Sequence, residues 1–210
     1  MILLVNILIH CGLIVNFLWY WIVLSKNFPQ ISRRVSITFL TILMALLLSI
    51  PILNMRFLVN KSYFQELWIG FILLGALFVV MGVLLFKKTI EISLENGYFI
   101  GKFSVLNKGV YEVVRHPIYL SYILIFIGFS FIFDSVISII LIPIIIIIFE
   151  IQAYCEEKYL FMKKFKKKYA KYKKKTPKRL MVPSPLNAFL LIIAFFVLYL
   201  GMVNFDAIFS

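Results

Sequence analysis

The chain has 210 residues, of which 63% are hydrophobic and only 15% are charged. Its mean hydropathy of +1.01 excludes a soluble globular domain. The apolar runs are continuous and too long for the alternating strands of about 10 residues that build membrane β-barrels. We therefore predict an all-α integral membrane protein, a polytopic bundle of transmembrane helices.

The net charge of +13 is concentrated near one apolar run. Of the 22 Lys and Arg residues, 12 lie between residues 158 and 179, directly after that run. We interpret them as a cytoplasmic segment that contacts anionic lipid head groups, and not as a nucleic-acid interface. Cys11 and Cys155 are 144 positions apart and neither belongs to a C-x-x-C pair. We therefore expect no disulfide framework and no metal site.

Six apolar runs are separable, and most approach the roughly 20 residues that a helix needs to cross a bilayer. The runs are 2–24, 35–53, 67–86, 118–133, 136–149 and 186–203. The first has no basic segment before it and no small-residue cleavage site, so we expect a retained span. Only Asp134 and Ser135 separate the fourth and fifth runs, which predicts a helical hairpin. The fifth helix must then continue past Glu150 towards Cys155 to regain the starting side.

The basic residues also predict an orientation and a division of the chain. Twenty of the 22 fall in segments that six spans place on one side, which puts the segments around residues 115 and 156 in the cytoplasm. We divide the chain into N-terminal helices (1–86), a core with the functional site (87–183) and an additional C-terminal helix (184–210). That last helix could serve packing or an oligomer contact. Alternating residues on either side of Glu95-Asn96-Gly97 predict a small hairpin or interfacial loop in 87–108.

The sequence Arg115-His116-Pro117-Ile118-Tyr119 stands at the start of the fourth apolar run. Proline suits the first turn of a helix, where its missing N–H costs nothing. Arg115 and His116 then lie beside the unpaired N–H groups of a helix start, which favour a carboxylate or a phosphate. The alternative interpretation is that Arg115 only ends a span at the lipid head groups.

A second polar cluster, Glu156 and Glu157, follows the fifth run. Helical spacing places Glu150, Tyr154 and Glu157 on one face. A carboxylate close to hydrocarbon needs a partner and is a functional candidate, although the lysines that follow could supply that partner. Beyond the cluster, the aromatic spacing of residues 165, 169 and 172 among lysines predicts an amphipathic surface helix whose aromatic stripe serves packing.

An anion pocket at Arg115 and His116 opposite the acidic Glu156 and Glu157 suits a zwitterion such as an amino-acid group. S-adenosylmethionine carries that group, an adenine that stacks on aromatic rings, and a sulfonium that carboxylates and ring faces stabilise. The sequence contains no G-x-G-x-x-G, Walker, H-E-x-x-H or nucleophile-elbow motif that would indicate other chemistry.

At these residues the chain resembles the isoprenylcysteine carboxyl methyltransferase and phospholipid methyltransferase superfamily of integral membrane enzymes. The resemblance runs from about residue 82 to residue 183, about half of the chain. The matching text is Gly109-Val110-Tyr111, Arg115-His116-Pro117-x-Tyr119, Glu156-Glu157-x-x-Leu160, Phe165, Tyr169, Tyr172 and Thr176-Pro177. It implies S-adenosylmethionine as the cofactor and a lipophilic acceptor that enters from the bilayer. The implied cofactor contacts are Val105, Leu106, Tyr111, Arg115, His116, Pro117, Tyr119 and Glu157.

The resemblance leaves the acceptor open: a prenylcysteine carboxylate, a phospholipid amine or another small lipophile. Glu156 is the candidate base if the acceptor is a protonated amine or a thiol. Lys166 replaces a glycine that is usual in the family, and Ala153 stands where prenylcysteine enzymes tend to carry an arginine. Membrane sterol reductases that use NADPH share the Arg-His-Pro-x-Tyr motif but lack the Glu-Glu pair. A reductase and a non-enzymatic membrane protein are therefore the alternatives.

Overall fold

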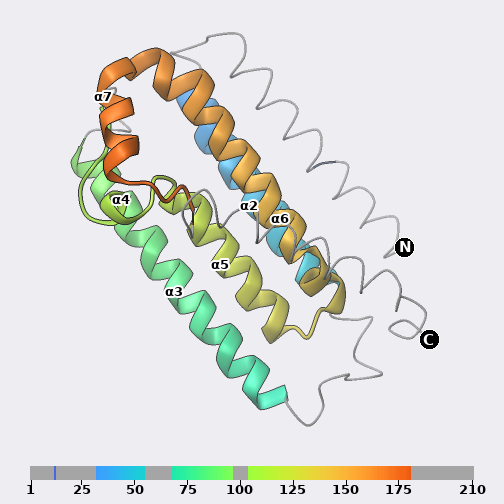
Figure 1. Cartoon of the computed structure of the whole chain (residues 1–210). Helices are drawn as coiled ribbons and strands as arrows, with labels where there is room; N and C mark the ends of the chain where they lie inside the picture. Colours follow the sequence, from blue (N-terminus) through green and yellow to red (C-terminus); the bar gives the residue numbers. More distant parts are fainter. Residues whose placement is uncertain (1–11, 13–31, 55–67, 97–103, 181–210) are drawn as a thin grey trace.

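The computed structural model describes residues 12, 32–54, 68–96 and 104–180. Every regular element in these ranges is helical, as the predicted all-α class requires. Figure 1 shows the elements in chain order: α2 (Ser32–Asn54), α3 (Trp68–Glu95), α4 (Val110–Val113), α5 (Pro117–Ile132), α6 (Val136–Cys155), the π-helix η3 (Glu156–Phe161) and α7 (Met162–Lys175). Apart from Gly12, the first and sixth predicted spans lie outside the described residues.

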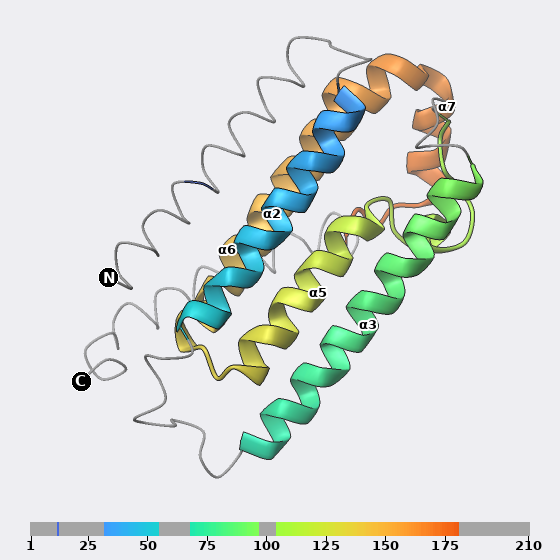
Figure 2. The same ribbon diagram turned by 180° about the vertical axis from the view of Figure 1, so that it is seen from behind.

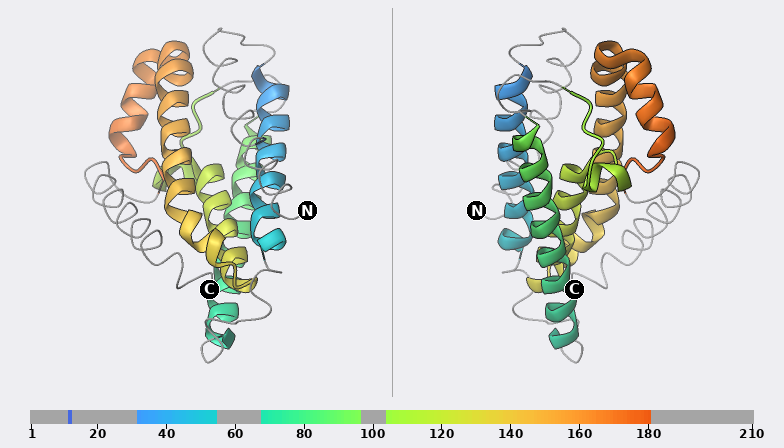
Figure 3. Two further views of the ribbon diagram at one scale, coloured as in Figure 1. Left: turned by 90° about the vertical axis from the view of Figure 1, so that its right-hand side faces the viewer. Right: turned by 90° about the vertical axis from the view of Figure 1, so that its left-hand side faces the viewer.

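Helix α5 lies between α3 on one side and α2 and α6 on the other (Figures 1 and 2). It runs opposite to α6, and residues 133–135 join the two helices. The left-handed φ of 48° at Asp134 turns the chain there, and Ser135 caps α6 by accepting from the Ser138 N–H. The fifth predicted helix does continue to Cys155, and it passes without a break into η3 and α7. Figure 3 shows α7 folding back from the end of α6.

The buried core lies where α2, α5 and α6 meet. Its most enclosed side chains are those of Leu47, Ile50, Ile123, Phe126 and Phe149. On the outside, α3 exposes large apolar side chains along its length, which suits contact with lipid. These side chains belong to Ile69, Leu73, Leu77, Val80 and Leu84.

Two segments, Ile69–Glu95 and Ile137–Lys175, are long and apolar enough to cross a membrane. A span needs about 20 residues, which α6 supplies in the second segment, so η3 and α7 lie beyond its apolar part. Helix α5 is apolar but shorter. The total of six spans, and the crossing of the membrane by α5 and α6 as a hairpin, stay predictions.

Small residues let α3 and α5 approach closely. A Cβ atom on Gly75 of α3 would lie 2.6 Å from the carbonyl oxygen of Gly128, and a Cβ on Gly128 would lie 2.6 Å from the carbonyl oxygen of Gly75. Two turns along, a Cβ on Gly82 would lie 2.9 Å from the carbonyl oxygen of Ser121. Close backbone approach at small residues is how helices associate where the solvent is hydrocarbon.

The prediction of a hairpin or interfacial loop from residue 87 was wrong for the first part of that segment. Residues 87–95 are the last turns of α3. Thr89 and Ser93 donate 2.7 Å hydrogen bonds to the carbonyls of Leu85 and Thr89, so their hydroxyls are satisfied within the helix. Both side chains are buried, which explains how an apparent strand pattern forms a helix that packs on one face.

Lys166 interrupts α7 with a φ of 43° and a ψ of −118°. This conformation carries little penalty for glycine but strains a residue with a Cβ. The kink divides α7, which runs from Met162 to Lys175, into two helical parts.

Lys166→Gly should therefore raise the free energy of unfolding by about 1 kcal/mol, because glycine removes the left-handed strain. Chemical unfolding of the purified protein in detergent, followed by circular dichroism, measures the change. Lys171→Gly is the matched control, since Lys171 lies exposed within the helical part of α7. That control should lower stability by about 1 kcal/mol, and equal effects at both positions would contradict the strain at Lys166.

Candidate functional site

The first wall of the site begins where Gly109 starts α4. Its φ of 56° is left-handed, and a Cβ atom there would lie 2.8 Å from Ile92. Helix α4 buries Tyr111, whose hydroxyl lies 3.3 Å from Ser93 Oγ of α3. The Tyr111 carbonyl accepts a 2.7 Å hydrogen bond from the Tyr172 hydroxyl of α7. Tyr111 thus joins α4 to both α3 and α7.

Arg115 lies in the turn between α4 and α5 and reaches Glu157 of η3. Its Nε donates to Glu157 Oε1 at 2.7 Å, and its Nη2 to Oε2 at 3.4 Å. Its Nη1 donates to the carbonyls of Thr176 and Pro177 at 2.6 and 2.7 Å. Both charged side chains are almost fully buried, at 3% and 2% exposure. The two motifs therefore meet in one buried ion pair, and Arg115 braces three segments of the chain.

His116 lies beside the same carboxylates. Its Nδ1 is 3.4 Å from Glu156 Oε2, and its Nε2 is 3.3 Å from Glu157 Oε1. The second contact does not have hydrogen-bond geometry, so Nε2 is a buried polar atom without a hydrogen-bond partner. The ring stacks on Tyr119, with centroids 5.5 Å apart, and tilts against Phe161 at 6.0 Å. The carboxylates of Glu156 and Glu157 and the rings of Tyr119 and Phe161 therefore surround the His116 ring.

Residues 176–180, which we call the return segment, lie against this wall. The backbone N–H groups of Arg115 and His116 donate 3.0 Å hydrogen bonds to the carbonyls of Lys178 and Arg179. These bonds and the Arg115 side chain hold the return segment over the start of α5. The segment follows α7 directly, so the fold-back of α7 brings it to the site.

The Arg179 side chain is a functional candidate that the sequence interpretation missed. It forms an ion pair with Glu150, lies 5.4 Å from the Tyr154 ring centroid and places its Nε 3.4 Å from Glu157 Oε1. These are the three residues predicted to share one face of the fifth helix. Lys173 Nζ also lies 3.5 Å from Glu157 Oε2. The carboxylates on this helix face indicated that a cationic partner was needed. The sequence did not indicate which of the twelve basic residues that follow supplies it.

The remaining predicted contacts surround the charged cluster. Pro117 occupies the first turn of α5, as predicted. Tyr119, two residues later, is buried and accepts a 3.2 Å hydrogen bond from Gln152 Nε2. Val105 and Leu106 lie in the segment that leads into α4, with Leu106 buried. Gln152 was also missed, because a polar residue inside an apolar run can only be assigned once its neighbours are known.

A comparison with protein-family models identifies the segment that contains both motifs. Residues 71–168 match the phospholipid methyltransferase family. The match extends from α3 into α7 and confirms the resemblance predicted from the two motifs. Searches of curated proteins and of solved structures found no match. The family implies methyltransferase activity and association with membranes.

Burial sets the protonation states of the charged cluster within the matched segment. Burial and, to a smaller extent, the neighbouring Glu157 carboxylate raise the pKa of Glu156 to about 8, so Glu156 is mostly protonated at pH 7. Burial alone would raise the pKa of Glu157, but the Arg115 guanidinium, which donates to both of its oxygens, outweighs burial and holds that pKa well below its usual range. Burial lowers the pKa of His116 and leaves its ring neutral at pH 7. Arg115 is then the permanent charge that keeps Glu157 ionised.

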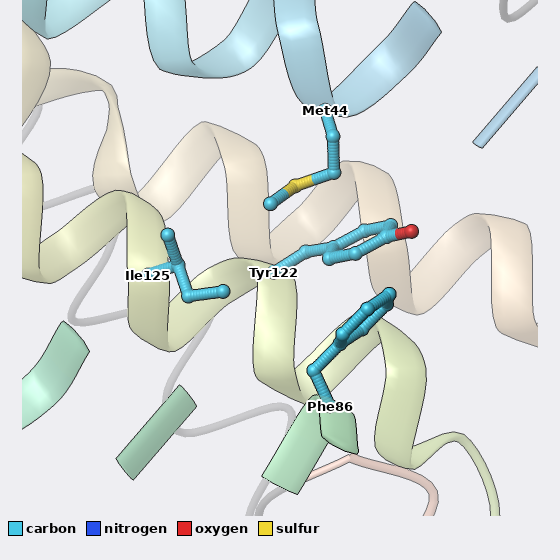
Figure 4. A pocket seen from close by; sticks show the side chains of 4 residues that line it. All are labelled: Met44, Phe86, Tyr122 and Ile125. Atoms are coloured by element: carbon cyan, nitrogen blue, oxygen red, sulfur yellow. The ribbon is translucent and has the colours of Figure 1, made fainter. Parts of the chain in front are cut away.

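An apolar cavity of about 250 Å³ opens between α2, α3 and α5 in the same structure. Figure 4 shows the side chains that line it, those of Met44, Phe86, Tyr122 and Ile125. Tyr122 lies 6.2 Å from Phe149, and Phe149 lies 5.3 Å from Tyr119, measured between ring centroids. Because Tyr119 stacks on His116, a row of aromatic rings links the cavity to the charged cluster.

Proposed function

We propose that the chain is an integral membrane methyltransferase that uses S-adenosylmethionine to methylate a lipophilic acceptor. The observation that carries the proposal is the meeting of Arg115 and His116 with Glu157 inside the segment that matches the phospholipid methyltransferase family. The family match supports the activity and the buried cluster supports its location, whereas a buried ion pair alone would fit a structural role.

The residues in the site fit the amino-acid portion of the cofactor. His116 Nε2 is buried without a hydrogen-bond partner, and the Tyr169 hydroxyl is buried without one as well. Such groups are costly unless a ligand satisfies them. Glu157 would hold the ammonium group of the cofactor, and Tyr119 would offer its ring. Val105, Leu106, Tyr111, Arg115, His116 and Pro117 would complete the contacts that the family resemblance implies.

When bound, S-adenosylmethionine would supply a methyl group from its sulfonium: the acceptor's lone pair would form the new bond to the methyl carbon as the carbon–sulfur bond breaks, and the thioether S-adenosylhomocysteine would leave. The protein's main contribution would be to position the two partners, which can supply roughly 7 to 11 kcal/mol of a barrier. Glu156 would take the proton from an amine or thiol acceptor, in the fraction of molecules in which it is ionised. A carboxylate acceptor needs no base.

The lipophilic nature of the acceptor is supported by the surroundings of the site. The apolar cavity between α2, α3 and α5 would receive an acyl or prenyl chain. The exposed lysines of α7 would contact anionic head groups and hold the site at the cytoplasmic surface. The predicted topology of six spans, with the clusters facing the cytoplasm, belongs to this proposal.

Calorimetry with S-adenosylhomocysteine tests the proposal on the purified full-length protein. We expect micromolar binding that weakens by about tenfold or more in Glu157→Gln and in His116→Ala, because a hydrogen bond to a charged group contributes about 1.5 to 3 kcal/mol. Lys171→Ala, at an exposed position of α7, is the control and should bind as the wild type does. Size-exclusion profiles establish that each variant is folded. Binding of NADPH in place of S-adenosylhomocysteine would support the reductase alternative and refute a methyltransferase.

A further inference from the structure

Glu157 has no room for a further partner in the arrangement described here. Its side chain is 2% exposed, and Arg115, His116, Lys173 and Arg179 all lie within 3.5 Å of its two oxygens. A ligand with a cationic group can reach this carboxylate only if one of these side chains moves away. The four contacts differ in how firmly the rest of the protein holds each side chain.

Arg115 and His116 are the fixed partners. Arg115 donates to two backbone carbonyls as well as to Glu157. The His116 ring lies between Tyr119 and Phe161, and its Nδ1 contacts Glu156. Displacing either side chain would break several contacts at once and leave buried polar groups unpaired.

Lys173 and Arg179 are held less firmly at Glu157. Lys173 is 46% exposed and can turn towards solvent. Arg179 is mostly buried, but its Nε contact with Glu157 does not have hydrogen-bond geometry. Its stronger contact is the ion pair between its Nη1 and Glu150, and its guanidinium also lies over the Tyr154 ring.

Glu150 and Tyr154 therefore form a second binding place for the Arg179 guanidinium, apart from Glu157. Glu150 lies seven residues before Glu157 and Tyr154 lies three before it, so about two turns and one turn of the continuous helix separate them from Glu157 on the same face. Arg179 can leave Glu157 and keep its charge paired, which avoids the cost of an unpaired buried cation. Lys173 needs no second carboxylate when it leaves Glu157, because solvent reaches its side chain.

We propose that Arg179 occupies the place on Glu157 that the ammonium group of the cofactor takes, and that Glu150 retains Arg179 when the cofactor enters. The inference rests on the proposed cofactor site and adds two residues that set its affinity. The return segment that carries Arg179 is bonded to the backbone of Arg115 and His116, so only the side chain has to move.

The sign of the change in affinity tests the inference. Arg179→Met removes the competing cation, and the dissociation constant for S-adenosylhomocysteine should fall by roughly threefold to tenfold. Lys178→Met removes an equal charge from the preceding residue and serves as the control, with a dissociation constant within twofold of the wild type. A positioning role for Arg179 predicts the opposite, namely weaker binding in Arg179→Met.

A double-mutant cycle that combines Arg179→Met with Glu150→Gln tests the role of Glu150. Glu150→Gln should weaken binding several-fold when Arg179 is present, because the guanidinium then stays on Glu157. In the Arg179→Met background the same substitution should change nothing. Equal effects of Glu150→Gln in both backgrounds would refute the inference, while wild-type binding would leave the proposed function standing. Absence of wild-type binding would refute both, and thermal melts in detergent establish that all four proteins are folded.

Discussion

Arg115→Met should lower the free energy of unfolding by about 3 to 5 kcal/mol, the usual cost of removing one member of a buried ion pair. The substitution leaves Glu157, at 1% exposure, without its closest partner. It also leaves the carbonyls of Thr176 and Pro177 without the Nη1 donor. The return segment should therefore loosen together with η3.

Equilibrium unfolding in mixed detergent micelles, followed by circular dichroism, measures this loss. The double variant Arg115→Met with Glu157→Gln should be more stable than the sum of the single changes implies, because no unpaired charge then remains buried. Lys175→Met, which removes an exposed cation that lies 3.9 Å from the exposed Glu112, is the control and should stay within about 0.5 kcal/mol of the wild type. A loss of less than 1 kcal/mol in Arg115→Met would contradict the buried pair.

Gly75→Ala should lower stability by about 1 to 3 kcal/mol, the usual range for overpacking a tight interface. The new Cβ would lie 2.6 Å from the Gly128 carbonyl oxygen and 3.0 Å from the Ile132 N atom. These are backbone atoms, which cannot turn aside as a flexible side chain can. Gly75→Leu should exceed this range, because α3 and α5 must then separate.

Gly70→Ala provides the matched control in the same helix. A Cβ at Gly70 would meet nothing within 4 Å, so alanine should leave stability unchanged or raise it by up to about 1 kcal/mol through helix propensity. The same unfolding measurement compares the two variants. Similar losses at both glycines would show that the helix itself, and not its packing on α5, responds to the substitution.

The boundaries of α2, α5 and α6 could be predicted from the sequence because hydrocarbon permits few alternatives to a helix. Pro117 begins α5 as predicted, and Asp134 and Ser135 lie in the turn before α6. The predicted loop from residue 87 failed for a related reason. Thr89 and Ser93 suit strands in isolation, but their hydroxyls bond back to helix carbonyls once the segment continues α3.

The meeting of the two motifs was also predictable, since they stand at the outer ends of two apolar runs that only residues 134 and 135 separate. The partners of the carboxylates were not. Twelve basic residues follow Glu157 along the chain, and local sequence gives no reason to select Arg179 or Lys173 among them. The choice depends on the kink at Lys166 and the fold-back of α7, which determine where the return segment lies.

By itself the sequence determined the class of the protein, the positions of α2, α5 and α6 and the residue types that the site requires. These follow from composition, from proline and turn residues, and from the cost of a carboxylate near hydrocarbon. The tertiary structure decided which groups touch: Arg115 braces Glu157, and Arg179 joins Glu150 to it. The physical reason is that ion pairs form between side chains that packing brings within about 4 Å, and these residues lie 42, 29 and 22 positions apart in the chain.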